Sequence, residues 1–205
     1  MLVWLDWPDM SAVSETIVRE YFELLGFLVR QQRKYVSPRR EDEEIDFFVW
    51  NPTPKPSSGP LPFVLSSEDL LRVERAVVVV KGWHTETFSP AVLAHAPEIY
   101  RFGDARVFQK AEKQFGPDGR TTKILIVPAL PQDAEARAQS IELLRSKGVD
   151  AIVLFHTLLA HLIAGIETNR NYQKSDLLQI IRVLKNYDFF REPQMELFKP
   201  ARAKK

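Results

Sequence analysis

Residues 76–83, which read Ala-Val-Val-Val-Val-Lys-Gly-Trp, decide the fold of this chain. Valine has a high strand propensity, and an apolar run without alternation is typical of a central strand that is covered on both faces. Lys81 at the end of this run is unusual, because an ammonium group in such a place needs a partner or water. We therefore expect Lys81 to face a site that includes carboxylates from other parts of the chain.

Composition and length limit the classes of protein to which the chain can belong. The chain has 205 residues, of which 45% are hydrophobic and 27% charged, which suits one globular domain with a full core. The formal net charge is +1, so a nucleic-acid partner would have to meet a local basic patch. The absence of cysteine excludes disulfides and thiolate metal sites. Since the start lacks signal-peptide features and no apolar run reaches about 18 residues, we expect a cytoplasmic protein that does not cross a membrane.

Hydrophobic periodicity and turn residues predict the elements around the valine strand. A helix is expected from Ser11 or Ser14 to Leu25, followed by two hairpin strands over 27–35 and 45–50. The segments expected after the valine strand are short helical turns within 90–102, a helix over 104–115, a strand over 123–127, a helix over 132–147, a strand over 151–155, and helices over 157–167 and 175–187. This order predicts an α/β fold with a mixed sheet and helices on both faces.

We expect a single domain over residues 1–205, because the sequence shows neither an internal repeat nor a second core. Residues 1–10 contain two tryptophans and are expected to form a packed arm. Residues 51–62 contain five prolines and are expected to form an exposed loop. Residues 196–205 are expected to form a basic, frayed tail.

Two more polar residues occupy positions where apolar ones are expected. Asp46 lies within an otherwise aromatic and aliphatic strand, and Glu15 lies at the edge of the apolar face of the first helix. Hydrolysis of a phosphodiester needs a metal that neutralises phosphate charge and activates water, and magnesium prefers carboxylate oxygens and water as ligands. A lysine beside carboxylates stays charged and can bind phosphate as a point charge.

This arrangement resembles the restriction-endonuclease-like superfamily, the PD-(D/E)XK nucleases. Val80-Lys81-Gly82 is most similar to the archaeal Holliday junction resolvases and related repair nucleases. In that family an αβββαβ core carries a glutamate on the first helix, an aspartate on the second strand and an (Asp/Glu)-x-Lys motif on the third, around one or two magnesium ions. The resemblance covers about residues 11–155.

The resemblance implies a metal-dependent nuclease or nuclease-derived DNA-processing protein that hydrolyses phosphodiester bonds of DNA. Glu15 and Asp46 would bind Mg²⁺ or Mn²⁺. Lys81 would orient or activate the attacking water and steady the charge on the phosphate. Many nucleases of this kind act as dimers, so a homodimer is a further expectation.

The chain departs from the family pattern at Val79, which takes the acidic position two residues before Lys81. Residues two apart share a strand face, so the missing carboxylate would have stood beside Lys81. The candidates to replace it are Glu44, Glu86, Glu98 and Glu112, with Glu98 at the most suitable distance along the chain. If none does, the chain is expected to be a catalytically inactive module on the same fold that binds nucleic acid or a protein partner.

Each residue of the site also has an ordinary structural explanation. A lysine at a strand end can extend to solvent, an aspartate can cap a turn or pair with Arg39 or Arg40, and a glutamate early in a helix is favoured by the helix dipole. The coincidence of Glu15, Asp46 and Lys81 favours the site, while an unrelated α/β protein is the remaining alternative.

The other polar residues are expected to be structural or solvated. His84 is interpreted as polar surface, although it has the chemistry to contact phosphate or act as a base. His156 and His161 are five apart, which is not the spacing of a helical metal pair. The basic residues at 106, 110 and 113 are interpreted as a solvated helix face that would contact phosphates only if it flanked the site.

Overall fold

A computed structural model describes residues 12–32, 45–56, 59–116 and 119–190 of the chain. The chain divides into two compact units, Met1–Gly165 and Ile166–Lys205, and each is described by itself. The arm expected at residues 1–10 and the tail expected at 196–205 lie outside the described residues. The expectation of one domain over residues 1–205 stays a prediction.

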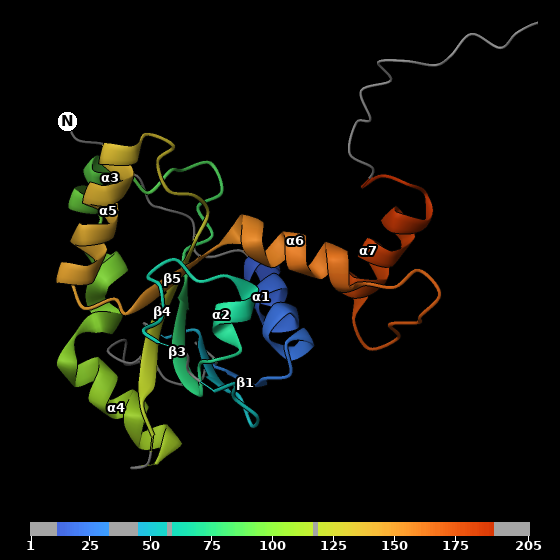
Figure 1. Cartoon of the computed structure of the whole chain (residues 1–205), viewed down its shortest axis with the longest axis horizontal. Helices are drawn as coiled ribbons and strands as arrows, with labels where there is room; N and C mark the ends of the chain where they lie inside the picture. Colours follow the sequence, from blue (N-terminus) through green and yellow to red (C-terminus); the bar gives the residue numbers. More distant parts are fainter. Residues whose placement is uncertain (1–11, 33–44, 57–58, 117–118, 191–205) are drawn as a thin grey trace, which may run out of the picture. The chain divides into compact units, whose positions relative to one another are not determined.

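An open five-stranded sheet in the order β1-β2-β3-β4-β5 forms the centre of the first unit (Figure 1). Its strands are β1 (Leu28–Gln31), β2 (Phe47–Trp50), β3 (Arg75–Val80), β4 (Thr121–Val127) and β5 (Ala151–Leu154). The β1–β2 and β2–β3 pairs are antiparallel, and the β3–β4 and β4–β5 pairs are parallel. The predicted α/β class with a mixed sheet is therefore confirmed.

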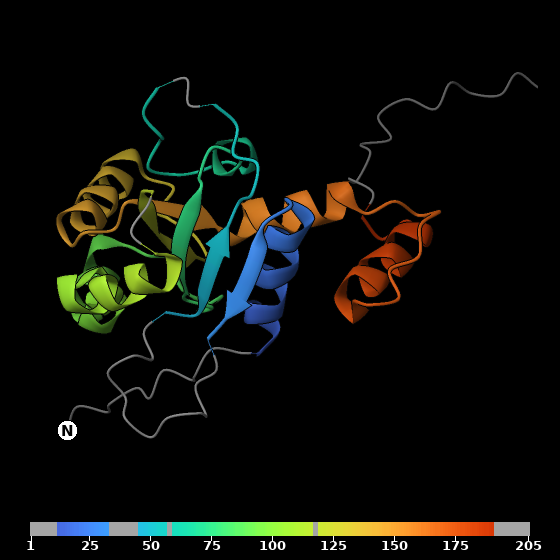
Figure 2. The ribbon, with the colours of Figure 1, turned by 90° about the horizontal axis from the view of Figure 1, so that it is seen from below.

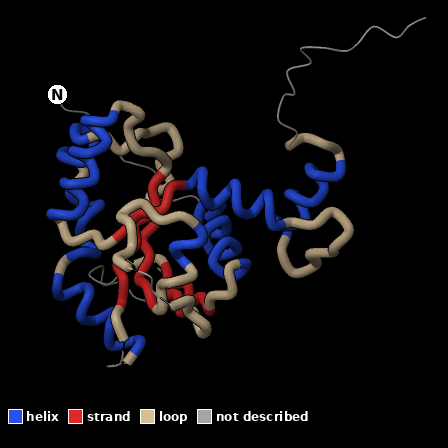
Figure 3. The backbone as a smooth tube through the Cα atoms, viewed as in Figure 1, coloured by secondary structure: helices blue, strands red, loops and turns tan. Residues whose placement is uncertain are grey.

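Helices cover both faces of this sheet, as Figures 2 and 3 show. One face carries α1 (Ala12–Leu24) and α6 (Phe155–Gly165), which contact each other. The other face carries α3 (Pro90–His95), the 3-10 helix η2 (Pro97–Gly103), α4 (Ala105–Phe115) and α5 (Ala134–Ser146). None of the helices in the described part of the chain is both long and apolar enough to cross a membrane.

The valine run forms the central strand that its composition predicts. Residues 76–80 are each at most 2% exposed. Val77 and Val79 belong to the apolar core that also contains Leu93 of α3, Ile99 of η2 and Leu144 of α5. Because successive residues of a strand point to opposite faces, Val78 and Val80 face the layer of α1 and α6.

Some element boundaries differ from the predicted ones. The first strand is Leu28–Gln31, four residues instead of the nine expected over 27–35, and the last three of those nine lie outside the described residues. The strand β4 starts at Thr121, where pairing with Arg75 extends it past the apolar run that marked its start in the sequence. Strand β5 ends at Leu154 and α6 begins at once with Phe155, whose buried ring fits helix as well as strand.

The segment before α2 (Ser67–Leu70) adds a short strand-like contact beyond β5. Val64 forms a parallel bridge with Ile152. The backbone nitrogen of Leu65 donates to the Ile152 oxygen at 2.8 Å, and the nitrogen of Ile152 donates to the Phe63 oxygen at 2.7 Å. The outer edge of β5 is therefore partly covered by the segment that connects β2 to β3 in the sequence.

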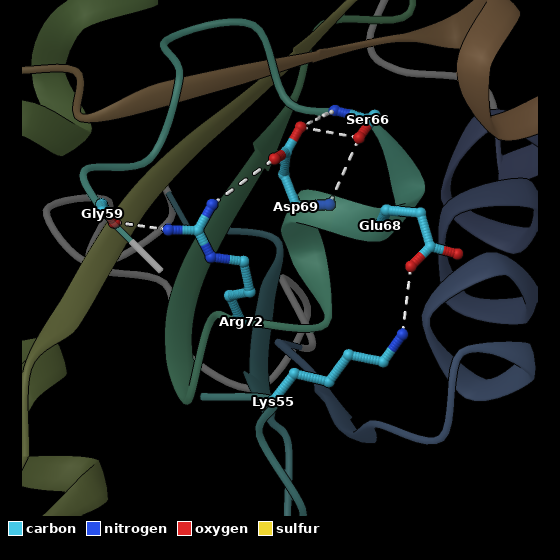
Figure 4. A network of polar contacts seen from close by, with 6 residues as sticks. All are labelled: Lys55, Gly59, Ser66, Glu68, Asp69 and Arg72. Carbon is cyan, nitrogen blue, oxygen red and sulfur yellow. Dashed lines mark hydrogen bonds and ion pairs between the residues drawn. The ribbon is translucent and has the colours of Figure 1, made fainter. Parts of the chain in front are cut away.

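A group of polar residues around α2 ties the proline-rich segment to this helix, and we call it the α2 cap network (Figure 4). Ser66 is the N-cap of α2 and forms a capping box with Asp69. Lys55 pairs with Glu68 at 3.0 Å, and Arg72 contacts Asp69 at 3.7 Å and donates to the backbone oxygen of Gly59. Its members are Lys55, Gly59, Ser66, Glu68, Asp69 and Arg72.

The second unit contains α7 (Asp176–Asn186). Ser175 caps it by accepting a hydrogen bond from the backbone nitrogen of Leu178 at 3.3 Å. Two basic side chains of α7 donate to backbone oxygens of the segment before it, Arg182 to Thr168 at 3.0 Å and Lys185 to Ile166 at 2.6 Å. These contacts fold the preceding segment back onto the helix.

Candidate functional site

Asp46 lies where the start of β2 meets the end of β3, because these two strands are antiparallel. Phe47 pairs with Val78. One residue earlier, the backbone nitrogen of Asp46 donates to the Val78 oxygen at 3.0 Å, and the Asp46 oxygen accepts from the nitrogen of Gln32 at 2.8 Å. The strand was expected to begin at Ile45, but β2 begins at Phe47. Asp46 therefore lies just before β2, although its backbone is bonded to both neighbouring segments.

The side chain of Asp46 is fixed against β3. It is 4% exposed, and its Oδ2 accepts a hydrogen bond from the backbone nitrogen of Val80 at 2.8 Å. A buried carboxylate is costly unless donors face it, and a backbone N–H stabilises its negative charge. This bond places the carboxylate beside the peptide group between Val79 and Val80, one residue before Lys81. The alternative pairing with Arg39 or Arg40 lies outside the described residues.

Lys81 leaves β3 in register with β4. Its backbone nitrogen donates to the oxygen of Ile126 at 2.9 Å, and the residue is half-buried. Strand alternation puts its side chain on the face of Val79. Phe47 pairs with Val78 and the Asp46 nitrogen donates to the oxygen of the same Val78, so two residues of this segment stand opposite one, which is the pattern of a β-bulge. Asp46 and Lys81 therefore lie at the same end of the sheet, on segments that adjoin β2 and β3.

Glu15 reaches this end of the sheet from the first turn of α1. Its Oε2 accepts a hydrogen bond of 2.5 Å from Nε2 of Gln31, the last residue of β1. The next residue, Gln32, is bonded to the backbone of Asp46. The carboxylate of Glu15 is thereby held beside the strand pair that carries Asp46.

The turn after β3 packs directly on α1 at Gly82. A Cβ atom at this position would stand 2.6 Å from Ser14 Oγ, so only glycine fits without a shift. The same Ser14 Oγ lies 3.0 Å from Nε2 of His84. Since Ser14 is the neighbour of Glu15 on α1, these contacts bring the turn that follows Lys81 to the helix turn that carries Glu15.

The contacts form a closed path around one end of the sheet, which we call the strand-end site. The structure brings Glu15, Asp46 and Lys81 to this end, while their chemical roles stay predictions. The path runs through Glu15, Gln31, Gln32, Asp46, Val80, Lys81, Gly82 and Ser14.

Val79 is a core position. It is 2% exposed and belongs to the apolar core under α3 and η2. A carboxylate here would be buried among aliphatic and aromatic side chains, which is unfavourable without a cation. Valine at this position therefore contributes to the packing of the core.

The structure places two of the four replacement candidates. Glu112 lines a pocket of about 470 Å³ with Thr121. Thr121 pairs with Arg75 at the start of β3, the opposite end from Lys81, so Glu112 is not part of the strand-end site. Glu86 is half-buried in the turn after Trp83, to whose oxygen its backbone nitrogen donates at 2.8 Å. Glu44 and the side chain of Glu98 lie outside the described residues.

Among the residues that the structure describes, no group of three or more His, Cys, Asp or Glu side chains is placed to hold a metal ion. Magnesium commonly keeps several waters and binds through one or two carboxylates plus the phosphates of a substrate. Asp46 and Glu15 each carry a carboxylate of the type that such a site would use.

The sequence does not single out two residues of this region. Gln31 is one polar residue among several on a short strand, and Ser14 is expected only as a possible helix cap. His84 is exposed, as its interpretation as polar surface predicts, and it also contacts Ser14 and the ring of Phe155. The expectation for His161 agrees with its place against the ring of Tyr21, at 5.5 Å between centroids.

In comparisons with known proteins, no family model, no curated protein and no solved structure matches the chain.

Proposed function

We propose that the protein is a metal-dependent nuclease of the restriction-endonuclease-like type that hydrolyses phosphodiester bonds of DNA. The observation that carries the proposal is the hydrogen bond from the backbone nitrogen of Val80 to Asp46. It joins the aspartate that interrupts one apolar segment to the strand that Lys81 follows. The element order, with one helix, two antiparallel strand pairs and then a parallel pair, supports it as well.

Asp46 and Glu15 are the residues that would hold Mg²⁺ or Mn²⁺. A metal bound there would neutralise phosphate charge and activate water. Asp46 is suited to the role because its burial and its bond to Val80 fix its oxygens before any ligand arrives. Glu15 is oriented in a similar way by Gln31.

Lys81 would contact the substrate itself. Lysine carries a positive charge on a flexible stem, which would allow it to follow a phosphate oxygen or to orient the attacking water. The contact of its backbone with β4 holds the start of that stem in place.

A second function is favoured by the buried position of Val79. Losing one carboxylate that would face the metal weakens cation binding, and the structure places an apolar core residue there. A module that binds DNA through Lys81 without cleaving it is therefore the alternative. Calorimetric titration with Mn²⁺ separates the two, since the nuclease requires specific uptake that is lost in Asp46→Asn.

The nuclease is tested with end-labelled branched, single-stranded and duplex DNA in the presence of Mg²⁺ or Mn²⁺. Cleavage is expected for the unaltered chain and is expected to be lost in Lys81→Ala and Glu15→Gln. Two exposed residues provide matched controls, Lys113→Ala at the other end of the sheet and Glu23→Gln at the other end of α1. Cleavage that survives Lys81→Ala would remove the proposed role of Lys81.

A further inference from the structure

His84 is an exposed histidine whose ring is nevertheless held on two sides. Its Nε2 lies 3.0 Å from Oγ of Ser14, which is 1% exposed. Its ring meets the buried ring of Phe155 edge-on, with 4.5 Å between centroids and 84° between planes. Ordering an exposed side chain costs rotamer entropy, so such a fixed imidazole on the surface calls for an explanation.

The second ring nitrogen, Nδ1, has no hydrogen-bond partner within the described part of the chain. In a neutral imidazole one nitrogen accepts and the other donates, and the partner of one nitrogen sets the state of the other. When the hydroxyl of Ser14 donates to Nε2, the proton lies on Nδ1. The ring then presents an N–H donor next to the turn formed by Lys81 and Gly82.

The surroundings of His84 point to an anion rather than to a nucleic-acid base. The neighbouring aromatic residue, Trp83, packs toward the core and against Phe88, with 5.6 Å between ring centroids, so it is not presented for stacking. The backbone nitrogen of His84 donates to the oxygen of Gly82 at 2.9 Å, and His84 Nε2 lies 3.7 Å from the place that a Cβ atom at Gly82 would take, so the ring stays at the turn that follows Lys81. A lysine and an imidazole N–H donor on the same turn are a combination that can bind phosphates.

We propose that His84 is a substrate-binding residue of the strand-end site, which donates from Nδ1 to an oxygen of a DNA phosphate adjacent to the cleaved one. Ser14 is its positioning residue, because it holds the opposite nitrogen. This inference rests on the proposed function and names a contact to the substrate that the metal and Lys81 do not provide.

Two conservative variants separate the two sides of the ring. The amide nitrogen of asparagine takes the place of Nδ1 and does not extend to Ser14. The amide of glutamine takes the place of Nε2 and leaves the Nδ1 position empty. His84→Asn therefore keeps the phosphate donor, while His84→Gln keeps the tie to Ser14.

The experiment measures the affinity of the full-length chain for duplex and branched DNA by fluorescence anisotropy without divalent metal, and single-turnover cleavage with Mg²⁺. His84→Ala and His84→Gln are expected to bind about tenfold to a hundredfold more weakly, which is the worth of a hydrogen bond to a charged group. His84→Asn is expected to stay within about threefold of the unaltered chain, since its donor remains. Ser14→Ala is expected to lie between these limits.

Recovery by glutamine but not by asparagine would show that the ring serves only to tie the turn to α1. Unchanged affinity in His84→Ala, in a chain that cleaves DNA, would overturn the role of His84 and leave the proposed function intact. A chain that neither binds nor cleaves DNA would overturn both. Circular dichroism melting of each variant checks that the fold is kept. If His84→Ala does not fold, the comparison of His84→Asn with His84→Gln tests the role of His84.

Discussion

The strand-end site and the α2 cap network are both groups of polar side chains, but they are assembled in different ways. The α2 cap network is local, because all its members lie between residues 55 and 72 (Figure 4). The strand-end site joins α1, β1, β2 and the turn after β3. In the first group each contact completes a helix cap or holds a nearby loop, while the second gathers distant side chains at one point.

Burial separates the two groups further. The Lys55–Glu68 pair is exposed, with 56% and 82% of the two side chains accessible, and such a pair contributes about 0–1 kcal/mol. Asp46 is buried, so its carboxylate has a desolvation cost that partners such as the Val80 nitrogen must offset. Polar groups of the second kind are the better candidates for function, because stability alone does not require them.

The largest difference is expected between equivalent substitutions in the two groups. Asp46→Asn retains an oxygen for the Val80 nitrogen but loses the charge, so cleavage is expected to fall about 100-fold or more with little change in unfolding free energy. Asp69→Asn is expected to leave the cleavage rate unchanged and to cost about 1 kcal/mol of stability. Cleavage assays and urea unfolding check both, and equal cleavage in the two variants would erase the distinction.

Tyr21 provides a pH test of the contact between α1 and α2, the two helices that carry parts of these groups. Its hydroxyl on α1 is bonded to Ser67 of α2 at 2.9 Å, and burial raises the pKa of Tyr21 to about 12, although the bond to Ser67 lowers it. Because the folded state keeps this proton more tightly than the unfolded state, the stabilisation is complete below about pH 10 and is lost as the pH rises through about 12.

The expected loss is about 2–3 kcal/mol of unfolding free energy between those limits. Urea unfolding at a series of alkaline pH values measures it. Tyr21→Phe is the control, since it removes the titrating group and should flatten this part of the curve. A Tyr21→Phe profile that is as steep as that of the unaltered chain would assign the effect to other groups.

Gly82 tests whether the strand-end site depends on its packing against α1. Gly82→Ala places a methyl group 2.6 Å from Ser14 Oγ, so we expect about 2 kcal/mol of destabilisation and reduced cleavage as the turn moves away from Glu15. Combining it with Ser14→Ala removes the clashing oxygen and should recover part of the stability. Thermal unfolding of the single and double variants measures this coupling, and strict additivity would contradict it.

The smallest effect is expected in the α2 cap network. Ser66→Ala removes the N-cap and should cost about 1 kcal/mol without changing cleavage. Lys55→Ala, which breaks an exposed pair, should cost less than about 0.5 kcal/mol. Urea unfolding ranks the two, and a change of cleavage rate in either would show that this region communicates with the strand-end site.

The elements with strong local patterns were predictable. The valine run, the apolar strands β4 and β5 and the helices around them follow directly from propensity and periodicity, and they define the α/β class. The hairpin of the first two strands was predicted as well, but the short extent of β1 and the contact of Val64 with Ile152 were not, because each depends on partners from another part of the chain. Propensity within a window of a few residues contains no information about that partner.

The residues of the candidate site likewise divide into those that the sequence reveals and those that only the structure reveals. Asp46 and Lys81 stand out in the sequence because each interrupts an apolar strand. Ser14 and His84 do not, because the contact between them joins side chains 70 residues apart and leaves no periodic trace. The packing of Gly82 against α1 was hidden for the same reason.

The contact of residues 63–65 with β5 also affects how the chain folds during synthesis. The segment is made early, but its partner Ile152 emerges from the ribosome only after β3 and β4. Contacts between residues so distant in sequence slow folding, and an unpaired strand edge can meanwhile pair with another chain. A nascent chain that ends before residue 152 therefore exposes both this segment and the edge of β4, and chaperone binding or self-association should be greatest at that length.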